Sequence, residues 1–198
     1  MTHSGILTQP FVDLQKQLLP TTVIEVGAYD ADFSRLMAEL MPPENIWAFE
    51  ANPEVWEQYR HGLSFHYLNK AVSDVNGTIP FQVQLDGLLA GNNSIKRRAE
   101  DKAYCYLPVE SVTLDSMFAE HQNVCLWIDC EGANKEVLTG AKQVLANTTS
   151  ILIEVEEQEY WHDQWLASDV VEYLDSLGFR LQDRDEQYQG QYNCIFVR

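Results

Sequence analysis

The chain has 198 residues, of which 45% are hydrophobic and 22% charged, and its formal net charge is −17. This composition is typical of one globular domain, and the acidic surplus argues against general nucleic-acid binding, which depends on lysine and arginine at the phosphates. No apolar stretch approaches the roughly 18 residues needed to cross a bilayer, and the N-terminus lacks a signal-peptide pattern. We therefore expect a single cytoplasmic domain over residues 1–198, without membrane insertion and of undetermined oligomeric state.

The N-terminal third predicts alternating helices and strands. Apolar residues at helical spacing indicate a helix within residues 1–20, ended by Pro20. "TVIEVG" then predicts a buried strand, the apolar positions of residues 33–41 predict a helix, and "NIWAFEA" predicts the next strand. Asn52 as N-cap and Pro53 at the first helical position indicate the start of another helix.

The middle of the chain predicts two strands and an irregular region. "SFHYLNKAVSD" predicts a third strand, and "GTIPFQVQL" a fourth, shorter one introduced by a turn at Asn76 and Gly77. The pattern is weak over residues 86–106, where "GNNSIKRRAEDKAY" concentrates polar and basic residues. We therefore expect a loop or lid over 86–106, before "YLPVESVTLDSMF" returns to ordered structure.

The last third returns to alternating strands and helices. "VCLWIDCEG" predicts a strongly apolar strand that ends in two carboxylates, and residues 137–145 then follow the pattern of one helix. "SILIEVEEQ" predicts another buried strand that ends in acids. Ser168 is expected to cap the next helix and Gly178 to end it, before "FRLQDRD" and "YNCIFVR" form a terminal hairpin.

This order predicts an α/β fold with a mostly parallel sheet covered by helices on both faces, because the strands are apolar on both sides. In such sheets the ligand lies at the carboxyl ends of the strands. The residues to consider first are therefore those at predicted strand ends: Glu25 to Asp30, Glu50, Ser73, Asp129 to Glu131, and Glu154.

The stretch "VIEVGAYDADFS" resembles a nucleotide-binding loop but has only one glycine, Gly27. It lacks the lysine and second glycine of a P-loop, and Asp30 and Asp32 would repel the pyrophosphate of a dinucleotide. Glu50, at the end of the next strand, is suited to accept hydrogen bonds from both ribose hydroxyls. An adenosine cofactor without phosphate fits both observations, and S-adenosylmethionine adds a sulfonium and an ammonium, which acids favour.

The order "VIEVGAYDADFS", "WAFEANP", "NKAVSDVNGTIPFQV", "GNNSI", "VTLDSMF" and "WIDCEGANKEVLTGAKQVL" resembles the FkbM family of S-adenosylmethionine-dependent methyltransferases. The resemblance covers nearly the whole chain from Val23 onward, and "IDCEG" with "EVLTGA" is its most specific part. It implies the class I methyltransferase (Rossmann-like) fold, a three-layer αβα sandwich whose mostly parallel seven-stranded sheet has an antiparallel last strand. It also implies methyl transfer to a hydroxyl, often on a sugar or a polyketide-like product.

By position, the resemblance matches Glu25, Gly27, Ser34, Glu50, Ser73 and Asp129 to the family's motifs, and their neighbours in the same loops complete the candidates. The cofactor-binding candidates are Glu25, Gly27, Ala28, Tyr29, Asp30, Ser34, Glu50, Ala51, Asn52, Ser73 and Asp129. The chain departs from the usual family pattern at Ala31, where the family has a second glycine, at Tyr29 and Asp30, and at Trp127, where it has a lysine.

Asp129 and Glu131 are the main catalytic candidates. They lie two residues apart at a strand end, so strand geometry would point them the same way. Because an alcohol is a poor nucleophile until its proton is removed, we expect one of them to be a general base and the other to bind the cofactor or orient the acceptor. The alternative is that both only cap the helix that begins near Ala133. His162 is a secondary candidate base because of its near-neutral pKa.

The candidates for acceptor binding are Asn92, Asn93, Ser94, Glu154 and Trp161. Each has a structural alternative. Asn92, Asn93 and Ser94 would belong to a polar loop, Glu154 would be a carboxylate hydrogen-bonded to backbone, and Trp161 would pack between loop and core. The basic run "KRR" after Ser94 would bind an acceptor phosphate or be solvated surface.

Metal chemistry is not assigned from the sequence. Glu154 could complete an acidic cluster that holds Mg²⁺, but the sequence does not assign a metal site. The four cysteines show no CxxC pair and are expected to pack as small hydrophobes, and the five histidines have no zinc spacing. The expected function is O-methylation of a small-molecule or glycan acceptor; the alternatives are a catalytically silent cofactor- or sugar-binding module and an N-methyltransferase.

Overall fold

The computed structural model describes residues 6–85, 89–99, 103–186 and 188–198. The helices among these residues are α1 (Thr8–Leu18), α2 (Asp32–Ala38), α3 (Pro53–Tyr59), α4 (Leu114–Phe118), α5 (Asn134–Thr139), α6 (Lys142–Ala146) and α7 (Ala167–Ser176). The strands are β1 (Thr22–Val26), β2 (Ile46–Phe49), β3 (His66–Leu68), β4 (Ala71–Val72), β5 (Gly77–Gln84), β6 (Tyr104–Val112), β7 (Val124–Ile128), β8 (Thr148–Glu156), β9 (Arg180–Arg184) and β10 (Gln191–Val197). No helix in this described part is long and apolar enough to cross a membrane.

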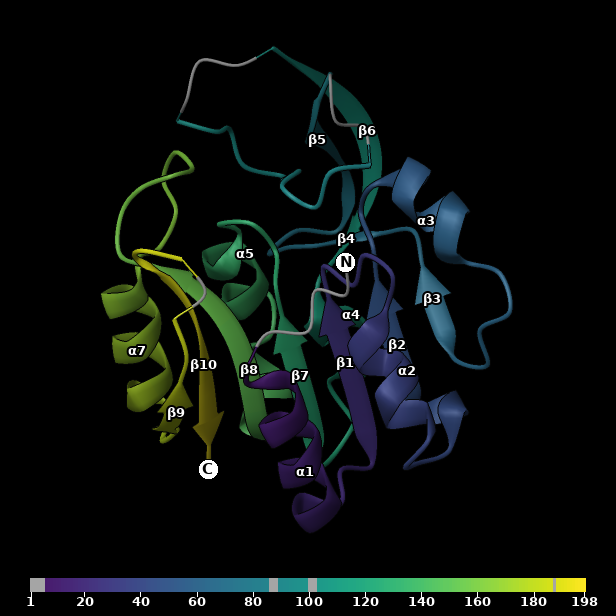
Figure 1. Cartoon of the computed structure of the whole chain (residues 1–198), viewed down its shortest axis with the longest axis vertical. Coiled ribbons are helices and arrows are strands. Elements are labelled where there is room, and N and C mark those ends of the chain that lie inside the picture. The colour runs from purple at the N-terminus through teal and green to yellow at the C-terminus, as the bar shows by residue number, and fades with distance from the viewer. Residues whose placement is uncertain (1–5, 86–88, 100–102, 187) are drawn as a thin grey trace.

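The main sheet has seven strands in the order β3-β2-β1-β7-β8-β10-β9 (Figure 1). The strands from β3 to β8 run parallel, and β10 is antiparallel to both β8 and β9. The chain order reverses direction between β1 and β7, which is where ligands bind in open α/β sheets. The predicted seven-stranded sheet with an antiparallel terminal hairpin is therefore confirmed.

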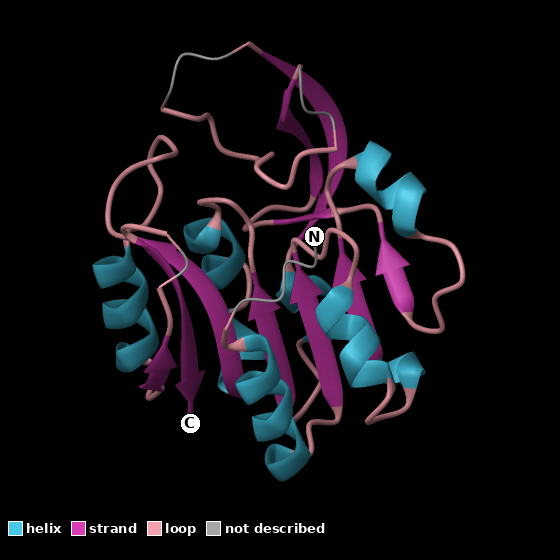
Figure 2. Cartoon of the chain, in the orientation of Figure 1, coloured by secondary structure: helices cyan, strands magenta, loops and turns pink. Residues whose placement is uncertain are grey.

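Helices cover both faces of this sheet and make a three-layer sandwich (Figure 2). On one face, Val23 and Leu152 pack against Phe11 of α1 and against α2. On the other face, Ile24 and Leu126 pack with α4, α5, α6 and α7. Burial of alternate side chains on both faces explains why the strands read as continuous apolar runs.

The prediction of one strand over "SFHYLNKAVSD" is wrong, because this stretch contributes two strands to two different sheets. β3 pairs with β2 in the main sheet, whereas β4 pairs with β6 in a second sheet of order β4-β6-β5. Asn69 lies between them, and its Nδ2 donates to the carbonyls of Glu50 (2.8 Å) and Ala51 (3.2 Å). The strand "GTIPFQVQL" is eight residues long rather than short, and pairs antiparallel with β6.

The expected loop or lid over 86–106 is shorter in the structure. β6 already begins at Tyr104, and residues 89–99 form an irregular segment that crosses from the second sheet toward the cavity described below. The parts of the prediction at 86–88 and 100–102 lie outside the described residues.

Two predicted helix boundaries also differ. The helix expected over 137–145 is two helices, α5 and α6, separated at Gly140, where a Cβ would lie 2.1 Å from the carbonyl oxygen of Ser73. The N-cap of α7 is Leu166 rather than Ser168, and the Leu166 amide donates to the Asp169 carboxylate at 2.8 Å. Caps one or two residues from the expected position are typical of helix ends read from sequence.

Candidate active site

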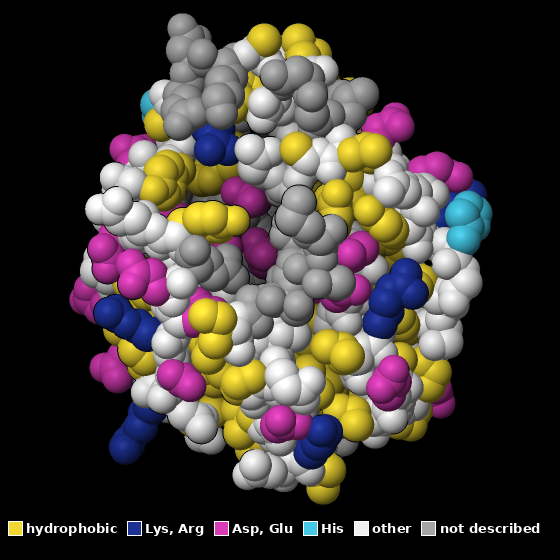
Figure 3. Space-filling model, in the orientation of Figure 1, with side chains coloured by type: hydrophobic (Ala, Val, Ile, Leu, Met, Phe, Trp, Pro, Cys, Tyr) yellow, Lys and Arg dark blue, Asp and Glu magenta, His cyan; other side chains and the backbone are white. Residues whose placement is uncertain are grey.

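A cavity of about 660 Å³ opens at the carboxyl ends of β1, β2, β7 and β8. Figure 3 shows a hollow in this face with Asp and Glu side chains inside it and hydrophobic side chains around it. A volume of this size is typical of small-molecule sites. The cavity brings together most of the predicted site residues: Glu25, Gly27, Ala28, Tyr29, Asp30, Glu50, Ala51, Asn52, Asn92, Asn93, Ser94, Asp129, Glu131, Glu154 and Trp161.

Gly27 allows the loop after β1 to pass against the end of β7. Its φ is +76°, and a Cβ there would lie 1.7 Å from the carbonyl oxygen of Asp129. The amides of Gly27 and Ala28 both donate to the Phe49 carbonyl, at 3.0 and 2.9 Å, so the loop is also fixed to β2. This close approach requires a glycine at position 27, and the requirement has nothing to do with binding a phosphate.

Tyr29 and Ala31 continue the loop in left-handed conformation, with φ values of +48° and +58°. Both are positions at which the sequence departs from the family pattern, and the left-handed region normally favours glycine. Tyr29 is held by Tyr67, whose hydroxyl donates to the Tyr29 carbonyl, and its own hydroxyl donates to the carbonyl of Leu89 at 2.9 Å. The loop after β1 is thereby connected to the segment that follows β5.

Glu50 connects the loops after β1 and β2. Its Oε2 accepts from the amide of Tyr29 at 2.9 Å, and its Oε1 accepts from the amide of Asn52 at 2.6 Å. The side chain is 8% exposed, and burial raises its pKa to about 7. Asn52 caps α3 by accepting from the Glu54 amide at 3.1 Å, as predicted. The carboxylate is therefore fixed in orientation at the edge of the cavity, where its remaining lone pairs can accept further hydrogen bonds.

Glu25 lines the cavity from the end of β1, and Ser34 holds it. Glu25 Oε2 accepts from the Ser34 amide at 2.9 Å and from the Ser34 hydroxyl at 2.5 Å. Burial raises the pKa of Glu25 to about 8, against the lowering effect of these two bonds. Ser34 itself is fully buried and does not line the cavity, so its contribution is to orient Glu25.

A cluster of carboxylates lies at the ends of β7 and β8. Asp129, Glu131 and Glu154 each place an oxygen within 4.8 Å of the other two. Burial, and then the charge of Asp129, raise the pKa values of Glu131 and Glu154 well above the ordinary range. Glu154 is oriented by Gln191, whose Nε2 donates to its Oε1 at 2.8 Å. Repulsion between carboxylates at this spacing favours retention of a proton within the cluster.

Glu156 is a site residue that the sequence reasoning missed. It lines the cavity, is 1% exposed, and accepts from Gln164 Nε2 at 3.1 Å. Burial and the charge of Asp129 raise its pKa to about 7. It lies two residues beyond Glu154 on β8, so strand alternation, which points both side chains to the same face, could have identified it.

The three clustered carboxylates are also the residues that could hold a divalent cation, because oxygen ligands suit Mg²⁺. The same grouping is suited to sharing protons, and no metal is assigned to it. The four cysteines are free thiols, and Cys125 and Cys194 are buried, as expected for small hydrophobes.

The polar segment after β5 lines the cavity, and two of its residues, Asn93 and Ser94, make hydrogen bonds within the protein. Asn93 uses its Oδ1 on the Gln84 amide and its Nδ2 on the Ala90 carbonyl, at 2.9 and 2.8 Å. The Ser94 hydroxyl donates to a backbone carbonyl at 2.7 Å. Asn92 Oδ1 is buried at the cavity and has no hydrogen-bond partner in the described structure, which leaves it available to a ligand donor.

Only part of the basic run from Lys96 to Arg98 is solvated surface. Lys96 is 10% exposed and pairs with Glu136 at 2.7 Å, whereas Arg97 is exposed. Arg98 lines the cavity, with its guanidinium 5.1 Å from the ring centroid of Trp161. Arg98 thus forms part of the wall against which the acids lie.

Ser73 and His162 are not among the cavity-lining residues. Ser73 is 1% exposed, and its hydroxyl lies 2.7 Å from the hydroxyl of Ser111 in the second sheet. The His162 side chain is 49% exposed, with Nδ1 4.0 Å from the carboxylate of Glu159. This position does not support His162 as a second base, because its side chain lies in the solvent-exposed loop beyond Trp161. The prediction rested only on the near-neutral pKa that is ordinary for histidine, which carries no information about position.

Trp127 and Trp161 are the tryptophans of the cavity wall. Trp127 occupies the position where the family usually has a lysine, and its ring stacks on Phe33 with centroids 4.7 Å apart. Trp161 is 1% exposed and packs over Gly132, where a Cβ would lie 2.3 Å from its ring. Other lining residues that the sequence reasoning did not single out are Lys70, Tyr188 and Gln191.

Residues 25–181 match the family described as the methyltransferase FkbM domain. The chain belongs to the FkbM methyltransferase family. It is therefore a methyltransferase of the kind that uses S-adenosylmethionine, since the family implies this cofactor. The close passage at Gly27 and the fixed carboxylate of Glu50 fit the ribose and methionine parts of that cofactor, neither of which carries a phosphate.

Three proteins that are similar to this FkbM methyltransferase are distant from it in sequence. The 2-O-methyltransferase NoeI of Sinorhizobium fredii is 23% identical over 173 residues, which make up 78% of this chain and 71% of that protein. Magnesium protoporphyrin IX methyltransferase of Synechocystis, solved with bound S-adenosylmethionine, has a TM-score of 0.52 at 8% identity over 96% of this chain and 79% of that chain. An rRNA methylase of Streptococcus thermophilus has a TM-score of 0.54 at 11% identity over 100% and 99% of the two chains. The two structures establish the class I methyltransferase fold and nothing further.

Proposed function

We propose that this FkbM methyltransferase moves the methyl group of S-adenosylmethionine to a hydroxyl of a small molecule or glycan. The observation that carries the proposal is the position of Asp129, Glu131 and Glu154 in the same cavity as Glu50. An oxygen acceptor needs a general base, and a carboxylate with a raised pKa is suited to that role near neutral pH. The name of the distant relative NoeI, a 2-O-methyltransferase, supports an oxygen acceptor.

In this proposal the residues at the β1 and β2 ends hold the cofactor. When bound, S-adenosylmethionine supplies an electrophilic methyl group on a sulfonium. Glu50 accepts hydrogen bonds from the ribose hydroxyls, and the loop from Gly27 to Asp30 runs alongside the ribose and methionine parts. Asp129 or Glu25 receives the cofactor ammonium, because both lie in the cavity and carboxylates favour a cation.

Glu131 is the proposed base. As the acceptor oxygen bonds to the methyl carbon and the bond from that carbon to the sulfonium sulfur breaks, the hydroxyl proton would move to a carboxylate oxygen of Glu131, which leaves a methyl ether, S-adenosylhomocysteine and protonated Glu131. Asp129, whose carboxylate lies within 4.8 Å of that of Glu131, orients the acceptor or exchanges roles with Glu131. Trp161 provides an apolar wall for a ring, and Asn92 Oδ1 accepts from an acceptor hydroxyl.

The test uses S-adenosylmethionine with a deuterated methyl group and a panel of neutral methyl glycosides and simple alcohols, with products identified by mass spectrometry. We expect label on oxygen, and a Glu131→Gln variant is expected to lower kcat by about 100-fold or more while binding S-adenosylhomocysteine normally. Glu157→Gln, an exposed carboxylate just beyond β8, is the matched control. Label found only on amine nitrogen of an added amine panel would assign N-methylation instead, and unchanged turnover of Glu131→Gln would remove Glu131 as the base.

A further inference from the structure

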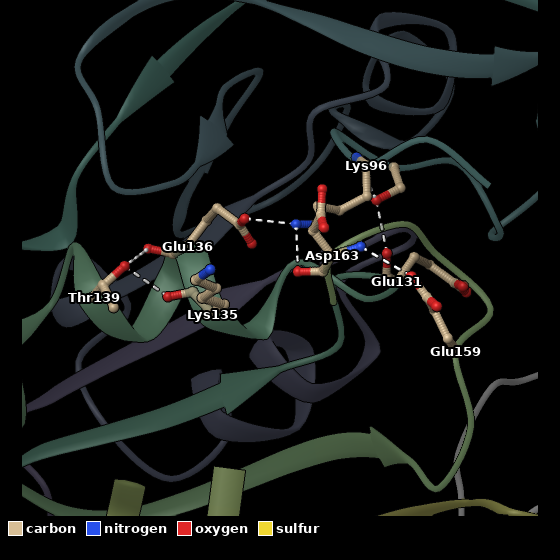
Figure 4. A network of polar contacts seen from close by, with 8 residues as sticks. Lys96, Glu131, Lys135, Glu136, Thr139, Glu159 and Asp163 are labelled. Carbon is tan, nitrogen blue, oxygen red and sulfur yellow. Dashed lines mark hydrogen bonds and ion pairs between the residues drawn. The ribbon is translucent and has the colours of Figure 1, made fainter. Parts of the chain in front are cut away.

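Lys96 joins three separate parts of the site. Its Nζ lies 2.7 Å from Glu136 Oε1 on α5 and donates to the carbonyl of Asp163 at 2.9 Å (Figure 4). Only 10% of its side chain and 20% of that of Glu136 are exposed. The ends of the surrounding segment are fixed as well, because Ser94 pairs with Gln82 and Arg98 with Trp161 through backbone bridges. An ion pair this buried is strongly unfavourable to break on one side only.

The same segment holds the backbone of Glu131. The Ser94 hydroxyl donates to the Glu131 carbonyl at 2.7 Å and accepts from the Lys96 amide at 3.0 Å. Glu131 has a φ of +50° and Gly132 one of +78°, so two left-handed residues in succession make a turn there. A non-glycine residue in this conformation persists where its surroundings hold it. Of Ser94 and Lys96, only Ser94 contacts the turn directly. Lys96 is joined to it indirectly, through the bond of its amide to Ser94 and through the bond of its Nζ to Glu136 on α5, the helix that the turn leads into.

We propose that Lys96 is a positioning residue for Glu131: with Ser94 it clamps the turn at Glu131 and keeps that carboxylate inside the cavity. The importance of this clamp for methyl transfer rests on the proposed function of Glu131 as the base. Lys96 itself does not line the cavity, so it acts through the turn rather than on a substrate.

The charged groups that face Glu131 determine what a loosened clamp would do. They are Asp129 from β7, Glu154 and Glu156 from β8, and Arg98 from the segment. Burial is the largest cause of the raised pKa of Glu131, followed by the charge of Asp129, whereas Arg98 lowers it. A turn that is released toward solvent loses the burial effect first, so the pKa of Glu131 should fall toward that of an ordinary glutamate.

The experiment is a carboxyl ¹³C NMR titration of the full chain with labelled glutamate, in which the Glu131 signal is assigned by its loss in Glu131→Gln. We expect Lys96→Met to lower the pKa of Glu131 by about one unit or more, and Lys96→Arg to restore it. Ser94→Ala should shift it in the same direction and add little to Lys96→Met, since both remove one clamp. Lys135→Met, an exposed lysine beside Glu136 on α5, is the matched control and should leave the pKa unchanged.

An unchanged Glu131 titration in Lys96→Met overturns the inference. If that variant does not fold, Lys96→Met with Glu136→Gln removes both charges and leaves no buried carboxylate without its cation, and the same criterion applies. The titration needs no acceptor, so it tests the positioning role of Lys96 even if the proposed function fails. That failure would be seen separately, as absence of S-adenosylhomocysteine binding or of methyl transfer in the unaltered protein.

Discussion

Replacing Glu50 with glutamine is expected to weaken the binding of S-adenosylhomocysteine about 30-fold. Both carboxylate oxygens of Glu50 accept backbone hydrogen bonds, from Tyr29 at 2.9 Å and from Asn52 at 2.6 Å. Glutamine can supply only one of these acceptors and turns an NH₂ group toward the other amide. The variant therefore loses the negative charge that would bind the ribose and disturbs both loops that frame it.

The magnitude follows from the kind of bond that is lost. A hydrogen bond to a charged group contributes about 1.5–3 kcal/mol, and a loss of about 2 kcal/mol corresponds to roughly 30-fold in Kd. Because burial raises the pKa of Glu50 to about 7, only part of the free protein carries the charge near neutrality. Affinity for S-adenosylhomocysteine should therefore rise as the pH increases through 7, and the Glu50 contribution to this rise should be absent in Glu50→Gln.

Isothermal titration calorimetry with S-adenosylhomocysteine at pH 6, 7 and 8 measures both effects. Glu54→Gln is the matched control, because Glu54 is an exposed glutamate in the first turn of α3 and only its backbone amide contacts the site, through Asn52. Wild-type affinity in Glu50→Gln, or the same pH dependence in both proteins, would refute the assignment of Glu50 to the ribose.

Three further predictions concern the loop, its buried acid and the carboxylate cluster. Gly27→Ala should abolish S-adenosylhomocysteine binding and lower the Tm, because the added Cβ would collide with the carbonyl of Asp129. Gly62→Ala is the control: it has a similar φ of +73° and no atom within 4 Å of the added Cβ, so it should lower the free energy of unfolding by only about 1 kcal/mol. Equal losses of stability in the two variants would show that the close approach to Asp129 is unimportant. Burial raises the pKa of Glu25 to about 8, so the stability that its proton contributes is fully present below about pH 4.5 and is lost as the pH rises toward 8. The free energy of unfolding in urea should therefore fall by up to about 1.4 kcal/mol per pH unit over this range, and Glu25→Gln should reduce this slope. Equal slopes in the two proteins would contradict the prediction. Methyl transfer should persist in EDTA, and activity lost to the chelator and restored by Mg²⁺ would assign the carboxylate cluster to a metal.

Much of the fold could be predicted because its strands carry strong local patterns. The runs that became β1, β7 and β8 are buried on both faces, and Asn52 with Pro53 marks a helix start by local chemistry alone. The second sheet could not be predicted in the same way. Nothing within "SFHYLNKAVSD" indicates that Asn69 turns the chain from one sheet to the other, because the bonds that do so reach Glu50 and Ala51, far away in sequence.

The candidate site shows the same limit at the level of side chains. The strand-end rule pointed to Glu25, Glu50 and the acids that follow β7, and these residues line one cavity because the rule depends only on topology. It could not distinguish a residue that faces the cavity from one that supports a neighbour. Ser34 orients Glu25 and Lys96 is buried against Glu136, and both facts depend on tertiary contacts that no spacing in the sequence reveals.

A crystal structure of the complex with S-adenosylhomocysteine would test the assigned site most directly. We expect the two ribose hydroxyls to lie within hydrogen-bond distance of Glu50, and the sulfur to face the carboxylates of Asp129 and Glu131 across a space wide enough for an acceptor hydroxyl. A ribose without contact to Glu50, or a sulfur directed away from these two carboxylates, would contradict both the cofactor site and the proposed base.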